Sequence, residues 1–376
     1  MLQREQLLKP LQLVLGAVDQ KQAMPILSNV LLDFDPQRLS VTGTDLEIEL
    51  IGQSAFSQAG GTEGRMTLPA RKLFDICKAL PENAPIELYH DKDRVILTSD
   101  RSRFVIATLS PDNFPSVELL AANVMLTVSQ REFATILHRT AFAMAQQDVR
   151  YYLNGMLLEV SDGVLRVVAT DGHRLALNEM PISTVLSATD KDKLAQVGLL
   201  QVILPYRAVI ELMRLLHDPE KDLTLYIGHH HLRVLSDDFT FTTKLIEGRY
   251  PDYQRVIPKM GQIQITADRD QLKQALQRTA ILCHDKVRGV RIELQKNCLK
   301  LSANNPEHEM AEEELAVNYL GESLDLAFNI TYLLDVLAVV KPGPVQLVLT
   351  DTTTSMRMEE PDSAARSVFV IMPMRL

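Results

Sequence analysis

Residues 7–50 read LLKPLQLVLGAVDQKQAMPILSNVLLDFDPQRLSVTGTDLEIEL and set a pattern that the chain shows twice more. Residues 133–177 read FATILHRTAFAMAQQDVRYYLNGMLLEVSDGVLRVVATDGHRLAL, and residues 272–315 read LKQALQRTAILCHDKVRGVRIELQKNCLKLSANNPEHEMAEEEL. Each stretch begins with apolar residues at helical spacing, crosses a polar loop, and ends in two strands of alternating hydrophobicity joined by a turn. Such self-similarity predicts one structural unit that is built three times.

A second pattern follows each of these stretches. Residues 68–81, 204–219 and 328–343 each predict a short amphipathic helix that proline or glycine ends, and a strand hairpin follows it. The 376 residues therefore form three units of about 125 residues, each in the order helix, strands, helix, strands. This order is typical of an α+β fold, with helices on one face of antiparallel sheets.

The repeats predict three domains, at residues 1–122, 123–259 and 260–376. Residues 183–198 have no counterpart in the other repeats, and we expect an inserted surface loop there. The opening MLQREQ lacks most of the strand that MLTVSQ and QITADR predict ahead of the corresponding helices. Either the start is truncated or the first sheet is short.

Composition favours a folded protein of the cytoplasm. Hydrophobic residues make up 46% of the chain, which is enough for packed cores. No apolar run approaches the ~18 residues that span a bilayer, and the N-terminus lacks the layout of a signal peptide. Cys77, Cys283 and Cys298 show no C-x-x-C spacing, so we expect buried thiols in a reducing compartment.

The net charge of -9 argues at first against nucleic acid, but the charges are segregated along the chain. The six predicted helices carry more basic than acidic residues, whereas acidic residues are dense in loops and strand ends such as residues 307–314. A basic solvated face is ordinary for one helix, but six with the same bias suggest one surface that contacts phosphates without reading bases. With 5% aromatic residues and no Trp, the chain is poorly equipped to stack single-stranded bases. The basic helix residues are Arg4, Lys9, Arg71, Lys72, Lys78, Arg131, Arg139, Arg207, Arg214, Arg269, Lys273, Arg278 and Lys341.

Five motifs, spread over the repeats, resemble those of the bacterial DNA polymerase III β subunits, the family of β sliding clamps. They are Gln147–Met156, Ala169–Ala176, Gly248–Tyr253, Asn304–Glu307 and Met372–Leu376. Each motif alone is weak evidence, but their common order, together with the three repeats, extends the resemblance over essentially the whole chain.

The resemblance implies a non-catalytic processivity protein that needs no cofactor and no metal. Two chains would form a head-to-tail homodimer, a ring that encircles double-stranded DNA without sequence preference, with helices lining the hole and sheets outside. The partners it implies are the replicative polymerase α subunit, the clamp loader, translesion and repair polymerases and mismatch-repair proteins, bound through short linear peptides. It also implies a cytoplasmic, nucleoid-associated protein with no membrane contact.

The same resemblance implies three sets of site residues. The partner-peptide groove would comprise Leu153, Thr170, Gly172, His173, Arg174, Leu175, Pro251, Arg255, Val256, Val287, Asn329, Tyr332, Ser355, Val370, Met372, Pro373, Met374, Arg375 and Leu376. The DNA contacts would be Lys21, Arg71, Gln147, Arg150, Tyr151, Tyr152, Arg207 and Lys273. The dimer interface would contain Lys72, Arg101, Arg103, Ile281, Leu282, Glu307, Glu309 and Glu312.

Two other interpretations stay open at this point, a repeat-built enzyme and a scaffold that binds only proteins. The most tempting enzyme signal is His229-His230-His231, but it lies where the other repeats place a hairpin turn, so we expect a turn and no metal site. No glycine-rich phosphate-binding loop is present, which disfavours ATP hydrolysis.

Overall fold

The computed structural model describes residues 2–18, 24–56, 63–117, 122, 124–161, 163–182, 199–258, 261, 263–361 and 366–375. The expected insert at residues 183–198 lies outside this part of the chain, as do Lys21 and Leu376. The described residues form two compact units. One lies within Met1–Arg131 and Glu211–Leu245, and the other within Glu132–Ser183, Val197–Ile210 and Ile246–Leu376.

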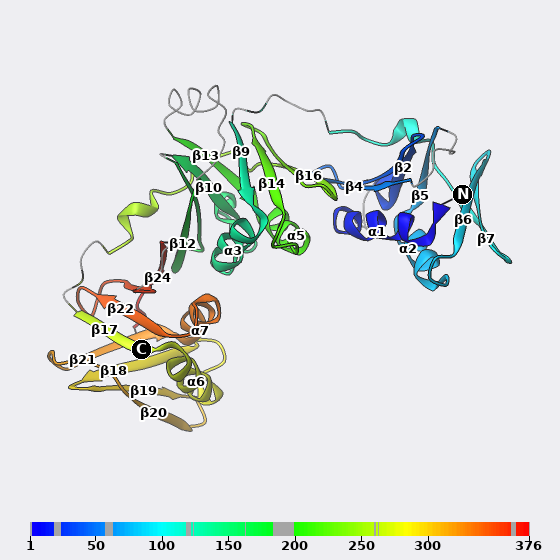
Figure 1. Ribbon diagram of the computed structural model, residues 1–376. Helices are drawn as coiled ribbons and strands as arrows, with labels where there is room; N and C mark the ends of the chain where they lie inside the picture. Colours follow the sequence, from blue (N-terminus) through cyan, green and yellow to red (C-terminus); the bar gives the residue numbers. More distant parts are fainter. Residues whose placement is uncertain are drawn as a thin grey trace. The chain divides into compact units, whose positions relative to one another are not determined.

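Helices and strands follow one another in the predicted order in each repeat (Figure 1). The first repeat contains β1 (Leu2–Gln3), α1 (Arg4–Val14), β2 (Asn29–Phe34), β3 (Arg38–Thr44), β4 (Ile48–Ala55), β5 (Gly64–Pro69), α2 (Ala70–Ala79), β6 (Pro85–Asp91), β7 (Arg94–Ser99) and β8 (Ser102–Ala107). The second contains β9 (Val124–Ser129), α3 (Gln130–Ala141), β10 (Gly155–Ser161), β11 (Val164–Thr170), β12 (Arg174–Pro181), β13 (Leu200–Pro205), α5 (Tyr206–Leu215), β14 (Asp222–Ile227), β15 (His231–Leu235) and β16 (Phe239–Lys244). The third contains β17 (Ile263–Asp268), α6 (Arg269–Thr279), β18 (Gly289–Gln295), β19 (Cys298–Asn304), β20 (Met310–Ala316), β21 (Leu324–Asn329), α7 (Ile330–Val339), β22 (Pro344–Leu349), β23 (Met356–Glu359) and β24 (Ser367–Ile371).

The strands form antiparallel sheets, and two of these sheets cross the boundaries between repeats. In the first unit, strands of repeats one and two make the sheet β5-β2-β3-β4-β16-β15-β14-β9. In the second unit, strands of repeats two and three make the sheet β13-β10-β11-β12-β24-β23-β22-β17. The boundary pairs are β4 with β16 and β12 with β24, which we call the first and second seams. The remaining sheets, β1-β6-β7-β8 and β20-β19-β18-β21, each lie within one repeat.

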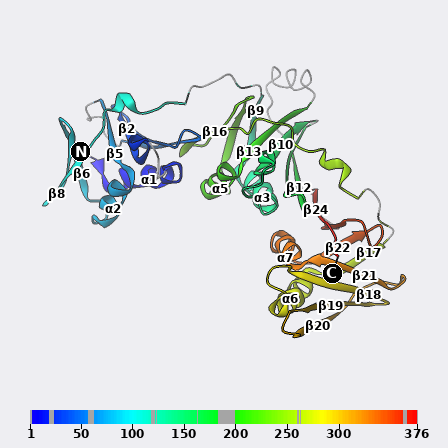
Figure 2. The same ribbon diagram turned by 180° about the vertical axis from the view of Figure 1, so that it is seen from behind.

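The helices are amphipathic and bury their apolar faces. Helices α1 and α2 lie side by side, and so do α6 and α7 (Figures 1 and 2). Helix α2 buries Leu73 and Cys77, and burial raises the pKa of the Cys77 thiol to about 12. Cys283 is also buried, but Cys298 is only half-buried, so the expectation of three buried thiols holds for two of them.

The first strand of the chain is short. Strand β1 has two residues, and they pair with Pro85 and Ile86 of β6. The equivalent strands β9 and β17 have six residues each. The histidine run forms the expected turn only in part: His229 and His230 lie between β14, which ends at Ile227, and β15, whose first residue is His231.

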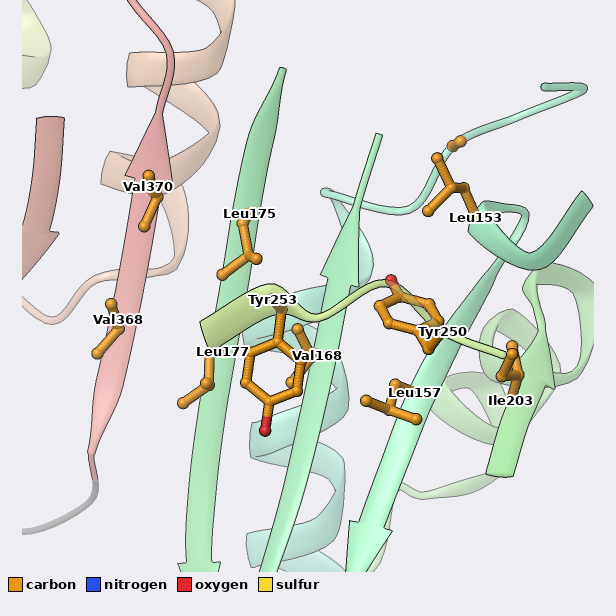
Figure 3. Packing of buried hydrophobic residues seen from close by; sticks show 11 residues of the cluster. Leu153, Leu157, Val168, Leu175, Leu177, Ile203, Tyr250, Tyr253, Val368 and Val370 are labelled. Carbon is orange, nitrogen blue, oxygen red and sulfur yellow. The ribbon is translucent and has the colours of Figure 1, made fainter. Parts of the chain in front are cut away.

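The segment that follows β16, residues 245–258, lies across the adjoining sheet and is called the linker here. Figure 3 shows Tyr250 and Tyr253 lying over the strands that carry Leu157, Val168 and Leu177. The Tyr250 hydroxyl accepts a hydrogen bond from the backbone N–H of Thr170 at 3.1 Å. The linker therefore buries an apolar face of the sheet beside the second seam and fixes the end of β11.

Candidate partner groove, DNA surface and dimer interface

Residues 372–375, called the tail here, extend from β24 and connect the second and third repeats. The Met372 N–H donates to the carbonyl of His173 at 2.9 Å, next to β12. Two residues later, the Met374 N–H donates to the carbonyl of Ala327 on β21 at 2.7 Å. These two backbone bonds hold the tail in an extended conformation across the boundary between the repeats.

A hollow of about 540 Å³ lies between the tail, the linker and the loop after β22, and we call it the partner groove. Val256 is 52% exposed and Met372 is 47% exposed, so apolar side chains are open to a ligand there. Seven of the nineteen predicted groove residues meet in this hollow. They are Arg255, Val256, Ser355, Met372, Pro373, Met374 and Arg375.

Three other predicted groove residues are buried and do not line the hollow. Leu153, Leu175 and Val370 are each 2% exposed and belong to the apolar cluster under Tyr250 and Tyr253 (Figure 3). Their side chains are packed against the chain itself, which fixes the position of the linker.

The turn between β11 and β12 contains four more predicted residues. The Thr170 hydroxyl donates to the Arg174 carbonyl at 2.6 Å, and one carboxylate oxygen of Asp171 accepts from the N–H groups of His173 and Arg174. Gly172 has φ +90, a conformation that glycine adopts without strain. His173, Arg174 and Tyr332 line a separate hollow of about 610 Å³, which also includes Phe142 and Asp171.

Val287 and Asn329 lie apart from the partner groove. Val287 is 42% exposed and lines a third hollow, of about 840 Å³, which shares Thr352, Met374 and Arg375 with the groove. The Asn329 side chain accepts from the N–H of Thr331 and so caps helix α7. Pro251 is exposed on the linker.

Sequence reasoning missed one wall of the groove. Ile257, Pro258, Thr350 and residues 352–354 line the hollow, but only Ser355 of that loop was predicted. The signal was the run Asp351-Thr352-Thr353-Thr354 between two strands. The Asp351 carboxylate accepts from the N–H groups of Thr353 and Thr354, the hydrogen bonding of an Asx turn, which shapes the loop.

The predicted DNA loop is rigidly built. The Asp148 N–H donates to the Asn154 side chain, whose amide donates back to the Asp148 carbonyl. The Arg150 side chain donates to both carboxylate oxygens of Asp148, and these hydrogen bonds lower the pKa of Asp148 to about 2. Tyr151 is 58% exposed beside Tyr152, and Gln147 has φ +57 at the exposed tip. Gln147, Arg150, Tyr151 and Tyr152 therefore lie on one surface loop.

The predicted basic helix residues divide into two groups. Arg71 and Arg207 are exposed and Lys273 is half-buried. Arg4 and Arg269 instead donate to Cys77 and Val340, the carbonyls that end the neighbouring helices, where a cation is favourable. The interpretation of Arg139 as part of a phosphate-contacting surface is wrong, because its side chain is 7% exposed and pairs with Glu360.

The predicted dimer residues form two groups, one in the first repeat and one in the third. Lys72 is exposed on α2, and Arg101 and Arg103 are exposed at and on β8, an edge strand of its sheet. Ile281 is 76% exposed, with Leu282 beside it, and Glu307, Glu309 and Glu312 lie before and on β20, the other edge strand. Glu312 pairs with Lys300 at 2.8 Å. The basic residues of this set thus belong to the first repeat and the acidic ones to the third.

Over the described residues, no group of three or more His, Cys, Asp or Glu side chains is arranged to hold a metal ion. In the same part of the chain, no helix is both long and apolar enough to cross a membrane.

The three repeats match three consecutive domains of one family. Residues 1–118 match the N-terminal domain of the DNA polymerase III beta subunit, residues 127–252 the central domain, and residues 254–375 the C-terminal domain. Tandem clamp domains with sheets that continue across their boundaries define the class of DNA sliding clamps.

Individual relatives agree over the full length. The beta sliding clamp of Pseudomonas putida is 48% identical over 375 residues, covering 100% of this chain and 99% of that protein. A crystal structure of the Pseudomonas aeruginosa clamp with ligand has a TM-score of 0.94 at 46% identity, with 100% and 99% coverage. A structure of that organism's clamp bound to griselimycin has a TM-score of 0.93 at 46% identity, with 100% and 98% coverage. The chain belongs to the DNA polymerase III beta subunit family, whose members are non-catalytic processivity factors in DNA replication.

Proposed function

We propose that two copies of this chain close head to tail into a ring around duplex DNA, and that the partner groove tethers polymerases and other replication proteins by short extended peptides. The dimer contact would form between β8 of one copy and β20 of the other. The observation that carries this proposal is the register that the two internal seams share.

The internal seams pair equivalent residues. Thr240 lies opposite Ile51 in the first seam, and Val368 lies opposite Leu177 in the second. Thr240 and Val368 hold the position that Arg103 holds on β8, because each of the three residues directly precedes the phenylalanine of its strand.

Ile51 and Leu177 hold the position that Glu312 holds on β20, because each of the three belongs to the third residue pair from the hairpin that precedes its strand. If β8 pairs with β20 of the second copy in the register of the two internal seams, Arg103 would lie opposite Glu312 and Val105 opposite Met310. Val105 is 45% exposed and Met310 is 61% exposed in the single chain, so the pairing would cover both. An opposite-charge pair beside an apolar pair is favourable across antiparallel strands.

Pairing β8 with β20 of the other copy would join the two four-stranded sheets into an eight-stranded sheet like the two internal ones. It would also cover two edge strands that a single chain leaves unpaired. Exposed Arg71 and Arg207, together with the loop around Gln147 and Tyr151, would contact the DNA backbone in the hole. Contacts of this kind give affinity that depends on salt and not on base sequence. Lys21, outside the described residues, belongs to the same proposed set.

The partner groove would take an extended peptide. Its walls offer exposed Val256 and adaptable methionines at 372 and 374, a composition that suits several related ligands. The Pseudomonas aeruginosa clamp was solved bound to griselimycin, which supports a ligand site on clamps of this family. The proposed partners are the replicative α subunit, the clamp loader, translesion and repair polymerases and mismatch-repair proteins, at the nucleoid in the cytoplasm.

The test is topological. Clamps loaded by their loader on nicked circular DNA are expected to stay bound in high salt, because the linkage does not depend on phosphate contacts. Cutting the circle should then release them. Loss at equal rates from circular and linear DNA would contradict the ring, and it would favour the alternative of a scaffold that binds only proteins.

A further inference from the structure

We infer that Arg174 is a positioning residue that holds the second and third repeats in the geometry of the partner groove, and that it does not itself contact the bound peptide. This inference rests on the proposed function of the groove. It assigns to Arg174 a role different from that of the tail and linker residues, which face the ligand.

The direction of the side chain is the first argument. Successive residues of a strand point to opposite faces of the sheet. Leu175 points to the face that Tyr250 and Tyr253 cover, so Arg174 points to the other face, toward the helices. It accordingly lines the hollow of about 610 Å³ that contains Phe142 and Tyr332, and it is absent from the lining of the partner groove.

The contacts of the guanidinium group are the second argument. Its Nε donates to the Asp171 carboxylate at 3.0 Å, and one terminal nitrogen donates to the carbonyl of Phe142 at 2.7 Å. The other terminal nitrogen pairs with Asp335 on α7. The side chain is 13% exposed, which leaves little of it for a ligand.

Two aromatic rings complete this environment. The guanidinium carbon lies 5.2 Å from the ring centroid of Phe142 and 4.4 Å from that of Tyr332. Phe142 follows α3 in the second repeat, whereas Tyr332 lies on α7 in the third. A planar, always charged guanidinium group can pair with carboxylates and stack on rings at once, which a lysine ammonium group cannot. Arg174 therefore connects the two repeats.

The position of this connection explains why it would matter for the groove. Arg174 pairs with Ile371 in the second seam. The backbone carbonyl of its neighbour His173 accepts a hydrogen bond from the N–H of Met372, where the tail begins. A shift of α7 relative to β12 would move the tail, since Met374 is bonded to Ala327 in the third repeat. Peptide affinity should thus depend on Asp335, which does not line the groove.

The experiment measures griselimycin binding by calorimetry on the full-length protein. Arg174→Met is expected to weaken binding by roughly tenfold or more, because it leaves the part-buried carboxylate of Asp171 without its cation. Asp335→Asn should weaken binding by several-fold, because it removes the ion pair between β12 and α7 while Arg174 keeps its pair with Asp171. The double variant should bind about as weakly as Arg174→Met alone, since both changes break one connection. Asp335→Glu keeps a carboxylate and should stay within about twofold of the wild-type affinity.

Asp238→Asn is the matched control, because Asp238 pairs with Lys221 at 2.5 Å in the other unit of the chain. It should leave binding unchanged, and thermal unfolding of every variant would identify any loss of folding. Normal binding by Asp335→Asn, with a large effect of Arg174→Met, would overturn the inference in favour of direct contact. A separate variant, Met372→Ala, tests the groove itself: if it binds normally, the proposed groove fails whatever Arg174 does.

Discussion

Phe104 on β8 offers the sharpest test of the proposed dimer. Phe241 and Phe369 hold the same position in the first and second seams, and both are fully buried, at 0% exposure. Phe104 is only half-buried in the single chain. If β20 of a second copy pairs with β8 as β4 pairs with β16, the Phe104 ring should become as buried as the other two.

The magnitude follows from the area that changes. Replacing a fully buried Phe by Ala costs about 3–5 kcal/mol, but most of the Phe104 side chain is already covered within the chain. Phe104→Ala should therefore weaken each contact by about 1 kcal/mol. A head-to-tail ring contains two such contacts, so the dimer should lose about 2 kcal/mol, or roughly thirtyfold in Kd.

Sedimentation velocity over a dilution series measures this Kd directly. Tyr89→Ala is the matched control, because Tyr89 is 66% exposed on β6 of the same sheet and lies on no edge strand. The monomer of each variant should keep its circular dichroism spectrum. Equal Kd values for Phe104→Ala and Tyr89→Ala would refute the strand pairing.

Three further predictions test the groove, a titration and a buried ion pair. Removing Met372–Leu376 should abolish griselimycin binding in calorimetry while the dimer persists; unimpaired binding would refute the groove. Burial raises the pKa of Glu49, so this carboxylate contributes stability that is present below its unfolded pKa and lost as pH rises through its folded pKa. Glu49→Gln, which keeps an acceptor for the Val117 N–H, should raise the free energy of unfolding at pH 8 but not near pH 4, and an equal gain at both values would exclude this cause. Arg139→Met should cost about 3–5 kcal/mol in urea denaturation because Glu360 stays buried without its partner, whereas a loss below about 1 kcal/mol would mean that water reaches the pair.

The repeat pattern made the fold predictable. Hydrophobic spacing located the helices at residues 68–81, 204–219 and 328–343, because these segments each bury one face. It could not show which strands pair across repeats, since β4 and β16 are almost two hundred residues apart and only tertiary packing brings them together.

The site was predictable in part, for a physical reason. The family resemblance identified the tail residues that line the groove, such as Met372. Charge alone misassigned Arg139, because an exposed arginine and an arginine in a buried ion pair look the same in a sequence. The partner, Glu360, is more than two hundred residues away and belongs to another repeat.

One pair of positions explains why the groove belongs to the second seam and not to the first. Leu175 lies opposite Val370 in the second seam, and both side chains are apolar and buried under the linker tyrosines. Glu49 lies opposite Thr242 at the equivalent position of the first seam. The Glu49 carboxylate binds the N–H of Val117, so a polar contact with the chain occupies the place of the apolar floor.

An apolar peptide side chain is stabilised only where it displaces water from apolar surface. At the first seam it would instead bury the Glu49 carboxylate, and the desolvation of that group would oppose binding. We therefore expect the first seam only to join two repeats, whereas the second would also present the proposed ligand site. By the same register the proposed intermolecular contact sets Val105 opposite Met310, an apolar pair like that of the second seam. The charged pair next to it, Arg103 with Glu312, then fixes the register of that contact, because a one-residue slip would turn every side chain to the opposite face.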